Sequence, residues 1–140
     1  MLSGILLPTA GNITVDGLNP FEDRKNYVSN IGVVFGQRSQ LAWDIPAEDT
    51  FDLLKDIYKL DNEKYQNTKA ELIKLLNIEE EIKKPVRSLS LGQRMRCEIA
   101  ASLLHEPKIL FLDEPTIGLD AASKKIVRDF ILKINKERKV

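Results

Sequence analysis

The feature that most constrains the fold of this chain is a short apolar run that ends in two acids. Residues 109–112 read Ile-Leu-Phe-Leu, and Asp113 and Glu114 follow directly. A run that is apolar at every position is typical of a parallel strand buried on both faces. Because ligands bind at the carboxyl ends of strands in open α/β sheets, the two carboxylates are predicted to lie at a ligand-binding edge.

Strand and helix patterns alternate along the rest of the chain. Residues 31–35 form a second apolar run of strand length, and residues 13–15 read as a short strand that closes in a turn at 16–17. Apolar residues recur at helical spacing in four further segments, which indicates an α/β fold. These segments begin at Pro46, at a cap formed by Asp61 or Asn62, just after Ser90, and near Asp120, and Pro85 is expected to end the second one.

The segment after Ser90 is predicted to be an amphipathic helix. Its apolar face carries Met95, Ile99 and Leu103. The charged side chains that are expected to point elsewhere are Arg94, Arg96 and Glu98. The last helix is expected to pack through Ile126, Val127, Phe130, Ile131 and Ile134.

Composition excludes several classes of function. The 140 residues hold 21 acidic and 21 basic side chains, so the chain offers no net basic field for nucleic acid or an anionic bilayer. The single cysteine, Cys97, cannot form an internal disulfide. No apolar run is long enough to cross a bilayer, and the start lacks the basic flank of a signal peptide. Any work at a membrane is therefore expected to go through a partner.

The two acids at 113 and 114 are candidates for metal-assisted hydrolysis. Asp113 can hold Mg²⁺, directly or through water, because Mg²⁺ prefers hard oxygen ligands. Glu114 points differently and can polarise an attacking water. The alternative is a strand that simply ends in two solvated acids before a proline turn.

A second group of candidate residues lies at the predicted helix start, where residues 89–93 read Leu-Ser-Leu-Gly-Gln. Ser90 can cap the helix, Gly92 lets a phosphate approach the backbone, and Gln93 adds a side-chain donor. The alternative is an ordinary Ser-capped helix. Gln37, just after the strand at 31–35, is a weaker candidate, because a glutamine at a strand end is often merely solvated.

In combination, these motifs closely resemble the ABC ATPase family from end to end of the chain. The order is that of the family: Gln37, a helical insert, Leu-Ser-x-Gly-Gln, four apolar residues with Asp-Glu-Pro-Thr, then Gly118-Leu119-Asp120. The resemblance implies a partial P-loop NTPase fold, with a short parallel sheet and a helical subdomain insert. It divides the chain into a partial ATPase core at 1–42, the helical subdomain at 43–87, and the remainder at 88–140.

The resemblance also implies a role for each matching residue. Asp113 is similar to the metal-binding Walker B aspartate and Glu114 to the catalytic base. Leu91 departs from the family's commoner glycine and should be tolerated if it points away from the phosphate. The segment 35–46 resembles multidrug or antibiotic exporter ATPases of the daunorubicin type. Gln37 is similar to the Q-loop glutamine that senses Mg²⁺. Ser90, Gly92 and Gln93 are similar to the signature motif, which binds nucleotide held by an opposite subunit. Asp120 is similar to the D-loop aspartate that communicates across the dimer.

Two family motifs do not occur in these residues. The phosphate loop, Gly-x-x-x-x-Gly-Lys-Ser/Thr, is absent, and the family's switch histidine would follow Val140. His105 is expected to be a solvated or helix-terminal histidine and not a substitute. We therefore expect the isolated fragment to be marginally stable and nearly inactive, with an exposed apolar edge on 109–112.

The function implied by the resemblance is ATP hydrolysis that drives export through a membrane permease. ATP and Mg²⁺ are the implied cofactors, and a transmembrane permease and a second ATPase domain are the implied partners, at the cytoplasmic face of the membrane. In the family the helical insert contacts the permease, which makes Trp43 and Asp44 candidates for that contact. Phe51 is a third candidate, although core packing is favoured for it.

Two other classes of function stay open. One is a non-catalytic module that binds a partner without turnover. The other is an ABC ATPase of DNA repair or translation, which is disfavoured because the chain shows neither a long coiled coil nor a basic RNA-facing segment.

Overall fold

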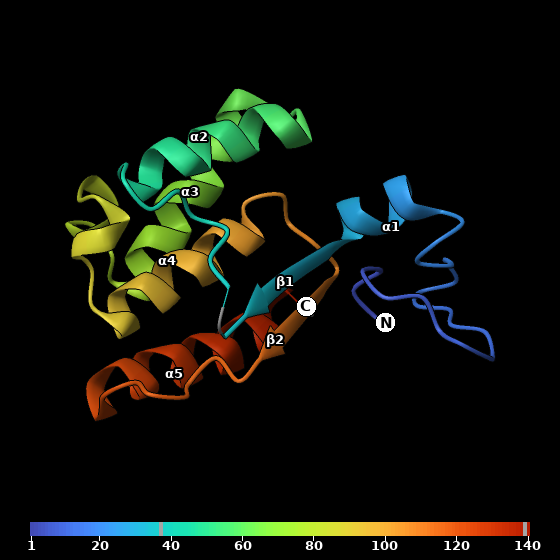
Figure 1. The fold of residues 1–140 in the computed structure, drawn as a ribbon. Coiled ribbons are helices and arrows are strands. Elements are labelled where there is room, and N and C mark those ends of the chain that lie inside the picture. Colours follow the sequence, from blue (N-terminus) through green and yellow to red (C-terminus); the bar gives the residue numbers. More distant parts are fainter. Residues whose placement is uncertain (37, 139) are drawn as a thin grey trace.

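The computed structural model describes residues 1–36, 38–138 and 140. Figure 1 shows helices α2, α3 and α4 grouped on one side of the molecule and the amino-terminal residues on the opposite side, with the two strands between them. The elements in chain order are α1 (Arg24–Asn30), β1 (Ile31–Phe35), α2 (Ala47–Tyr58), α3 (Asn62–Leu76), the 3₁₀ helices η1 (Glu81–Lys83) and η2 (Val86–Ser88), α4 (Leu91–Leu103), β2 (Ile109–Asp113) and α5 (Ala121–Arg138).

The two strands pair in parallel. Ile31 lies opposite Ile109, and the register continues to Phe35 opposite Asp113. Both predicted strands are confirmed, and so is the α/β architecture. However, residues 109–112 are half-buried, not buried on both faces as expected. The reason is that the sheet has two strands among the described residues, which leaves the other edge of β2 unpaired.

The prediction of a strand at 13–15 is wrong in extent. Val15 and Leu18 form one antiparallel bridge around a two-residue turn, in which Asp16 and Gly17 have φ values of 50° and 75°. Positive φ at both central residues is the geometry of a type I′ hairpin turn. The predicted turn is therefore present, but residues 13 and 14 belong to no strand.

The helical segment begins and ends close to the expected residues. Helix α2 begins directly after Pro46, and the side chain of Asp61 caps α3 by accepting a hydrogen bond from the Lys64 amide (3.0 Å). Helix α3 ends at Leu76, before left-handed Asn77, so Pro85 does not end it and lies instead between η1 and η2. Phe51 is fully buried, which confirms that it packs in the core.

Helix α4 is buried on more than its apolar face. Met95, Ile99 and Leu103 are buried as predicted, but Arg96 and Glu98 are buried as well, at 6% and 5% exposure. The expectation that these two charged side chains point away from the core is therefore wrong.

Arg96 is buried because it caps the end of α3. Its Nη1 donates to the carbonyl oxygens of Leu76 (2.9 Å) and Asn77 (2.5 Å), and its Nη2 lies 3.6 Å from Glu81 Oε1. The last carbonyl oxygens of a helix have no hydrogen-bond donor within that helix. A guanidinium placed there therefore supplies donors that these carbonyl oxygens would otherwise lack. A polar contact, and not only apolar packing, joins α4 to the helical insert.

The final helix packs as expected. Val127, Phe130 and Ile134 of α5 are buried, and Ile126 and Ile131 are partly buried. Within the described residues, no helix combines the length and apolar character needed to span a bilayer.

Arg96→Ala is expected to lower the free energy of unfolding by about 3 kcal/mol, because it removes one partner of a buried ion pair and uncaps α3. Urea denaturation followed by circular dichroism measures this change. Arg128→Ala is the matched control, since Arg128 is 73% exposed and should change stability by less than about 0.5 kcal/mol. Equal losses of unfolding free energy in the two variants would show that Arg96 does not cap α3.

Candidate functional site

The two acids lie at the carboxyl tip of β2. Asp113 is the last residue of the strand, and both Asp113 and Glu114 are exposed. Glu114 has a positive φ of 49°, a conformation that costs a non-glycine residue about 1 kcal/mol and recurs at functional sites. The predicted placement of both carboxylates at a strand tip is confirmed.

The exit of β1 packs directly against this tip. A Cβ built on Gly36 would lie 2.9 Å from the Asp113 carbonyl oxygen, so glycine permits the two strand exits to touch. Gln37, the next residue and the predicted metal sensor, lies outside the described residues. The exit of β1 at Gly36 therefore lies at the same edge as the two acids.

The predicted signature motif forms the start of α4. Ser90 is the amino-terminal cap: its Oγ accepts from the Gln93 amide (3.3 Å), and Gln93 Oε1 accepts in return from the Ser90 amide (2.9 Å). This reciprocal capping box satisfies two amides at the helix start. Among the described residues, the Ser90 hydroxyl donates no hydrogen bond.

Gln93 donates one side-chain hydrogen bond within the chain. Its Nε2 donates to Glu81 Oε1 (3.3 Å), and the amide carries a second N–H, so the role of Gln93 as a donor to a ligand stays a prediction. Glu81 also lies beside Arg96, and its carboxylate therefore links the helix start to the guanidinium that caps α3. This role of Glu81 was missed from sequence, because nothing in the spacing of η1 and α4 indicates the contact.

Gly92 is packed against α5. A Cβ at this position would lie 2.3 Å from Ser123 Oγ and 3.4 Å from Asp120 Oδ2. The space beside its Cα is filled by Ser123, so glycine is needed here for packing, and the approach of a phosphate to the Gly92 backbone stays a prediction. Leu91 turns toward Gly118, where a Cβ would lie 3.0 Å from Leu91 Cδ2.

Asp120 caps the start of α5. Its Oδ1 accepts from the Ser123 amide and its Oδ2 from the Ser123 hydroxyl, both at 2.9 Å. These hydrogen bonds hold the pKa of Asp120 below its usual value. The amino-terminal ends of α4 and α5 thus lie side by side (Figure 1). The candidate residues form two groups, one at the strand tips and one at these two helix starts.

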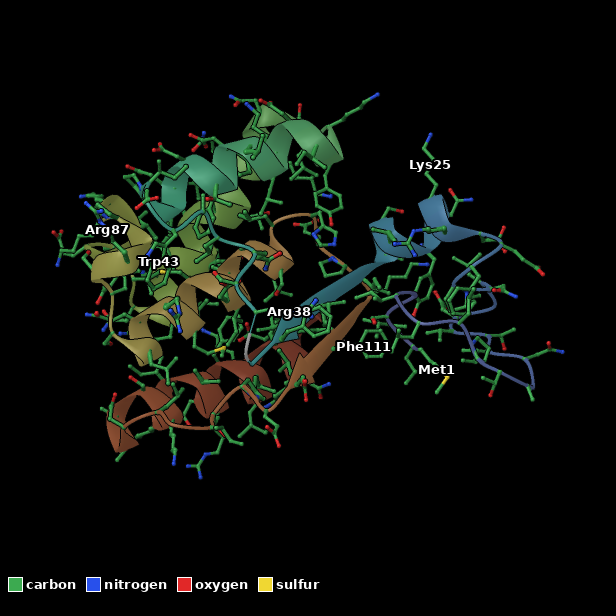
Figure 2. The ribbon with its side chains drawn as sticks, viewed as in Figure 1. Met1, Lys25, Arg38, Trp43, Arg87 and Phe111 are labelled. Atoms are coloured by element: carbon green, nitrogen blue, oxygen red, sulfur yellow. The ribbon has the colours of Figure 1, made fainter. Side chains whose placement is uncertain are left out.

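Trp43 lies on the surface beside the start of α4. It is 51% exposed, and the guanidinium carbon of Arg94 lies 5.4 Å from its ring centre. Its carbonyl oxygen accepts from the Arg87 amide (2.9 Å), and Figure 2 shows Trp43 and Arg87 on the helical side of the molecule. Asp44 is also exposed and lies 3.4 Å from Arg87 Nη1. Both candidates for a partner contact are therefore at the surface.

His105 is not solvated, although it does follow the end of α4. Its Nε2 bonds to the Ile31 carbonyl oxygen (2.8 Å), and its ring stacks on Tyr58 with centroids 4.1 Å apart. Its Nδ1 is buried without a partner in the described structure. Burial lowers the pKa of this histidine, because the charged form is desolvated. His105 serves to join α2 and α4 to β1.

The donor set at the strand tip fits Mg²⁺. Mg²⁺ is usually held by one or two carboxylates together with substrate phosphates and water, not by an all-protein cage. Asp113 and Glu114 are carboxylates exposed at one edge. No cluster of three or more His, Cys, Asp or Glu ligands occurs in the part of the chain that is described. The edge can therefore hold Mg²⁺ only together with a ligand that supplies further oxygens.

Comparison with known proteins identifies consistent relatives. A family model described as ABC transporter matches residues 1–117. The ABC transporter ATP-binding protein NatA of Bacillus subtilis (strain 168) is 32% identical over 139 residues, which cover 99% of this chain and 56% of NatA. Daunorubicin resistance ATP-binding protein DrrA3 of Streptomyces coeruleorubidus is 33% identical over 131 residues, or 94% of this chain and 41% of DrrA3.

A solved structure shares the fold. The dimeric, post-hydrolysis structure of the ATP-binding cassette MJ0796 with ADP and Pi aligns with a TM-score of 0.80 and 26% identity. The alignment covers 98% of this chain and 64% of that one. The chain thus spans about half the length of the curated relatives it matches. The predicted resemblance to daunorubicin-type proteins is confirmed, because DrrA3 is among the relatives.

Gly92→Ala is expected to lower the free energy of unfolding by about 1–3 kcal/mol, because the added methyl group overlaps Ser123. Ser123→Gly removes the overlapping atoms, so the double variant should lose less stability than the sum of the two single variants. Denaturation midpoints of the four proteins give this coupling. Strict additivity would show that Gly92 and Ser123 do not touch.

His105 is expected to make stability depend on pH. Its pKa is lowered in the folded chain, so the unfolded chain binds a proton more readily, and stability falls as pH decreases below the ordinary value of 6.5. His105→Gln keeps an N–H donor near Ile31 and removes the titration. Unfolding free energies between pH 8 and pH 5.5 should fall more steeply for the native chain than for the variant. Parallel curves for the two proteins would show that His105 is not the source of the pH dependence.

Proposed function

The chain belongs to the ABC transporter family of ATP-binding domains, and on that premise we propose that it forms part of an ATPase subunit that powers export across a membrane. The observation that carries the proposal is the placement of Asp113 and Glu114 at the tip of β2, against the exit of β1 at Gly36. This edge is where a bound nucleotide would meet both carboxylates.

The two acids have separate roles in this proposal. Asp113 would hold Mg²⁺, which neutralises charge on the phosphate oxygens when it is bound. Glu114 would orient the attacking water and accept its proton. Gln37 is proposed to sense the same metal, and its position immediately after Gly36 supports this.

The start of α4 is proposed to bind nucleotide held by a second ATPase domain. The first amides of a helix have no acceptor inside that helix, and the helix dipole favours a phosphate there. The Ser90 hydroxyl hydrogen would be donated to that phosphate. Gly92 would contribute its backbone amide, and Gln93 would act indirectly by fixing Ser90. Asp120, beside Gly92, is proposed to carry the signal across the dimer.

The division at 1–42, 43–87 and 88–140 is proposed to correspond to the partial core, the helical subdomain and the signature region. The helical subdomain would meet a transmembrane permease. Trp43 and Ile45, which are 51% and 41% exposed, offer an apolar surface for that contact. The protein would thus lie at the cytoplasmic face of the membrane through the permease, with no role for nucleic acid.

A second candidate function is partner binding without turnover. It is favoured by one observation: the 140 residues contain no Gly-x-x-x-x-Gly-Lys-Ser/Thr motif. A chain of these residues alone would have no lysine and amide cradle for the phosphates. The two candidates differ in whether Glu114 matters when that cradle is supplied.

The test is a chimera in which residues 1–140 replace the matching part of NatA. Folding is checked by circular dichroism, and ATP hydrolysis is measured with Mg²⁺ present. We expect turnover in the chimera and none in the 140-residue chain alone. A folded but inactive chimera would favour the non-catalytic candidate, and an isolated chain as fast as intact relatives would refute the proposed division of the site.

Glu114→Gln in this chimera is expected to lower kcat by about 10²–10⁴-fold, because it removes the general base. Asp129→Asn, which removes an exposed acid on α5, is the matched control and should leave turnover unchanged. An active chimera that loses nothing on Glu114→Gln would remove Glu114 from the catalytic role.

A further inference from the structure

Glu98 is a buried carboxylate in the middle of α4, and no part of the proposed chemistry uses it. Its side chain is 5% exposed. The Ser39 hydroxyl donates to its Oε1, and the Gln40 amide donates to its Oε2 (3.2 Å). In addition, Gln40 Nε2 donates to the Glu98 carbonyl oxygen (3.2 Å). Three hydrogen bonds therefore tie one residue of α4 to a segment 58–59 positions earlier in sequence.

The segment that Glu98 holds is the one that follows Gln37. Residues 39 and 40 lie in neither a helix nor a strand, so hydrogen bonds outside regular structure must hold them. Ser39 Oγ also accepts from the Leu41 amide (3.2 Å), and the buried Leu41 side chain anchors the next position. Ala42 is tied to α2 by its amide, which donates to Thr50 Oγ1 (3.2 Å).

Packing alone does not hold residues 39 and 40. Both line a cleft of about 280 Å³, which also borders Glu98, Tyr58 and His105. Side chains that face a cleft lack neighbours on one side, so the bonds to Glu98 provide the attachment. Burial raises the pKa of Glu98, and the hydrogen bonds from Ser39 and Gln40 oppose that rise.

An apolar side chain would fill this position at lower cost if stability were the only need. Burying a carboxylate is unfavourable unless its oxygens are satisfied, and here the donors come from one short segment. The arrangement therefore fixes that segment relative to α4, whose start carries Ser90 and Gln93. Glu98 therefore connects the two directly.

We propose that Glu98 is a positioning residue, which fixes the segment after Gln37 relative to the helix that begins at Ser90. The attachment of residues 39 and 40 to α4 is inferred from their hydrogen bonds to Glu98 and does not depend on the proposed function. Its consequence for ATP hydrolysis rests on the proposed function.

Amide hydrogen exchange of the 140-residue chain tests the attachment. Glu98→Ala should accelerate exchange at the Gln40 amide by about tenfold, the factor for ~1.4 kcal/mol of lost local stability, with little change at Ile99 or Ala100. Ser39→Ala removes the hydroxyl that donates to Glu98 and should accelerate exchange at the Gln40 amide by a smaller factor. This variant keeps the test valid if Glu98→Ala folds poorly. Glu63→Ala, at an exposed site on α3, is the control.

Two results of this experiment would overturn the attachment. One is unchanged exchange at Gln40 in both variants. The other is equal acceleration at Gln40 and inside α4, which would mean that Glu98 only supports global stability. Glu98→Gln retains one acceptor oxygen, so its exchange rate should lie between those of the native chain and Glu98→Ala.

Kinetics of the NatA chimera test the consequence for catalysis. Glu98→Ala should lower kcat by about tenfold with an unchanged KM for ATP, because orientation and not nucleotide binding is lost. Glu98→Gln should restore part of kcat, and Glu63→Ala should match the parent. An unchanged kcat in Glu98→Ala would overturn the catalytic consequence. A parent chimera without activity would instead refute the proposed function, and the exchange result would still decide the attachment.

Discussion

The structure depends on the contacts that α4 makes with α3, with α5 and with the segment after β1. Arg96 holds the end of α3, Glu98 holds the segment after β1, and Gly92 admits the start of α5. Apolar packing fixes a helix by shape, and the buried polar side chains of α4 add directional hydrogen bonds to specific partners. Hydrogen bonds donated by a buried guanidinium and accepted by a buried carboxylate restrict the position of α4, because each group is costly to leave unpaired.

This arrangement explains how distant segments are held together with so little sheet. In the part of the chain that the structure describes, two strands supply one ladder of backbone bonds, and α4 contacts β1, α2, α3, α5 and η1. Glu81 extends them, because one of its carboxylate oxygens meets both Gln93 and Arg96. The start of α4 is therefore tied to the helical insert on one side and to α5 on the other. These side-chain contacts connect the insert to the residues that cap α4 at Ser90.

The two groups of candidate residues differ in character. The acids at the strand tip are exposed and free to meet a metal and a phosphate, whereas the side chains around Ser90 are mostly engaged within the chain. The capping box leaves Ser90 with one hydroxyl hydrogen and places Gln93 in a supporting role. Such a division fits the proposed nucleotide site between two domains, because a surface that is rigid before contact loses less entropy on binding.

The sequence by itself determined most local elements: the apolar run before Asp113, the Ser90 cap, the starts of α2, α3, α4 and α5, and the family, although it did not indicate α1. These depend on neighbours within a few residues, where periodicity and capping chemistry are decisive. Only the tertiary structure decided that Arg96 and Glu98 are buried, that Gly92 faces Ser123, and that His105 joins three elements. Their partners lie roughly 20 to 75 residues away in sequence, and the amphipathic pattern of one helix carries no information about which distant group will satisfy a charge.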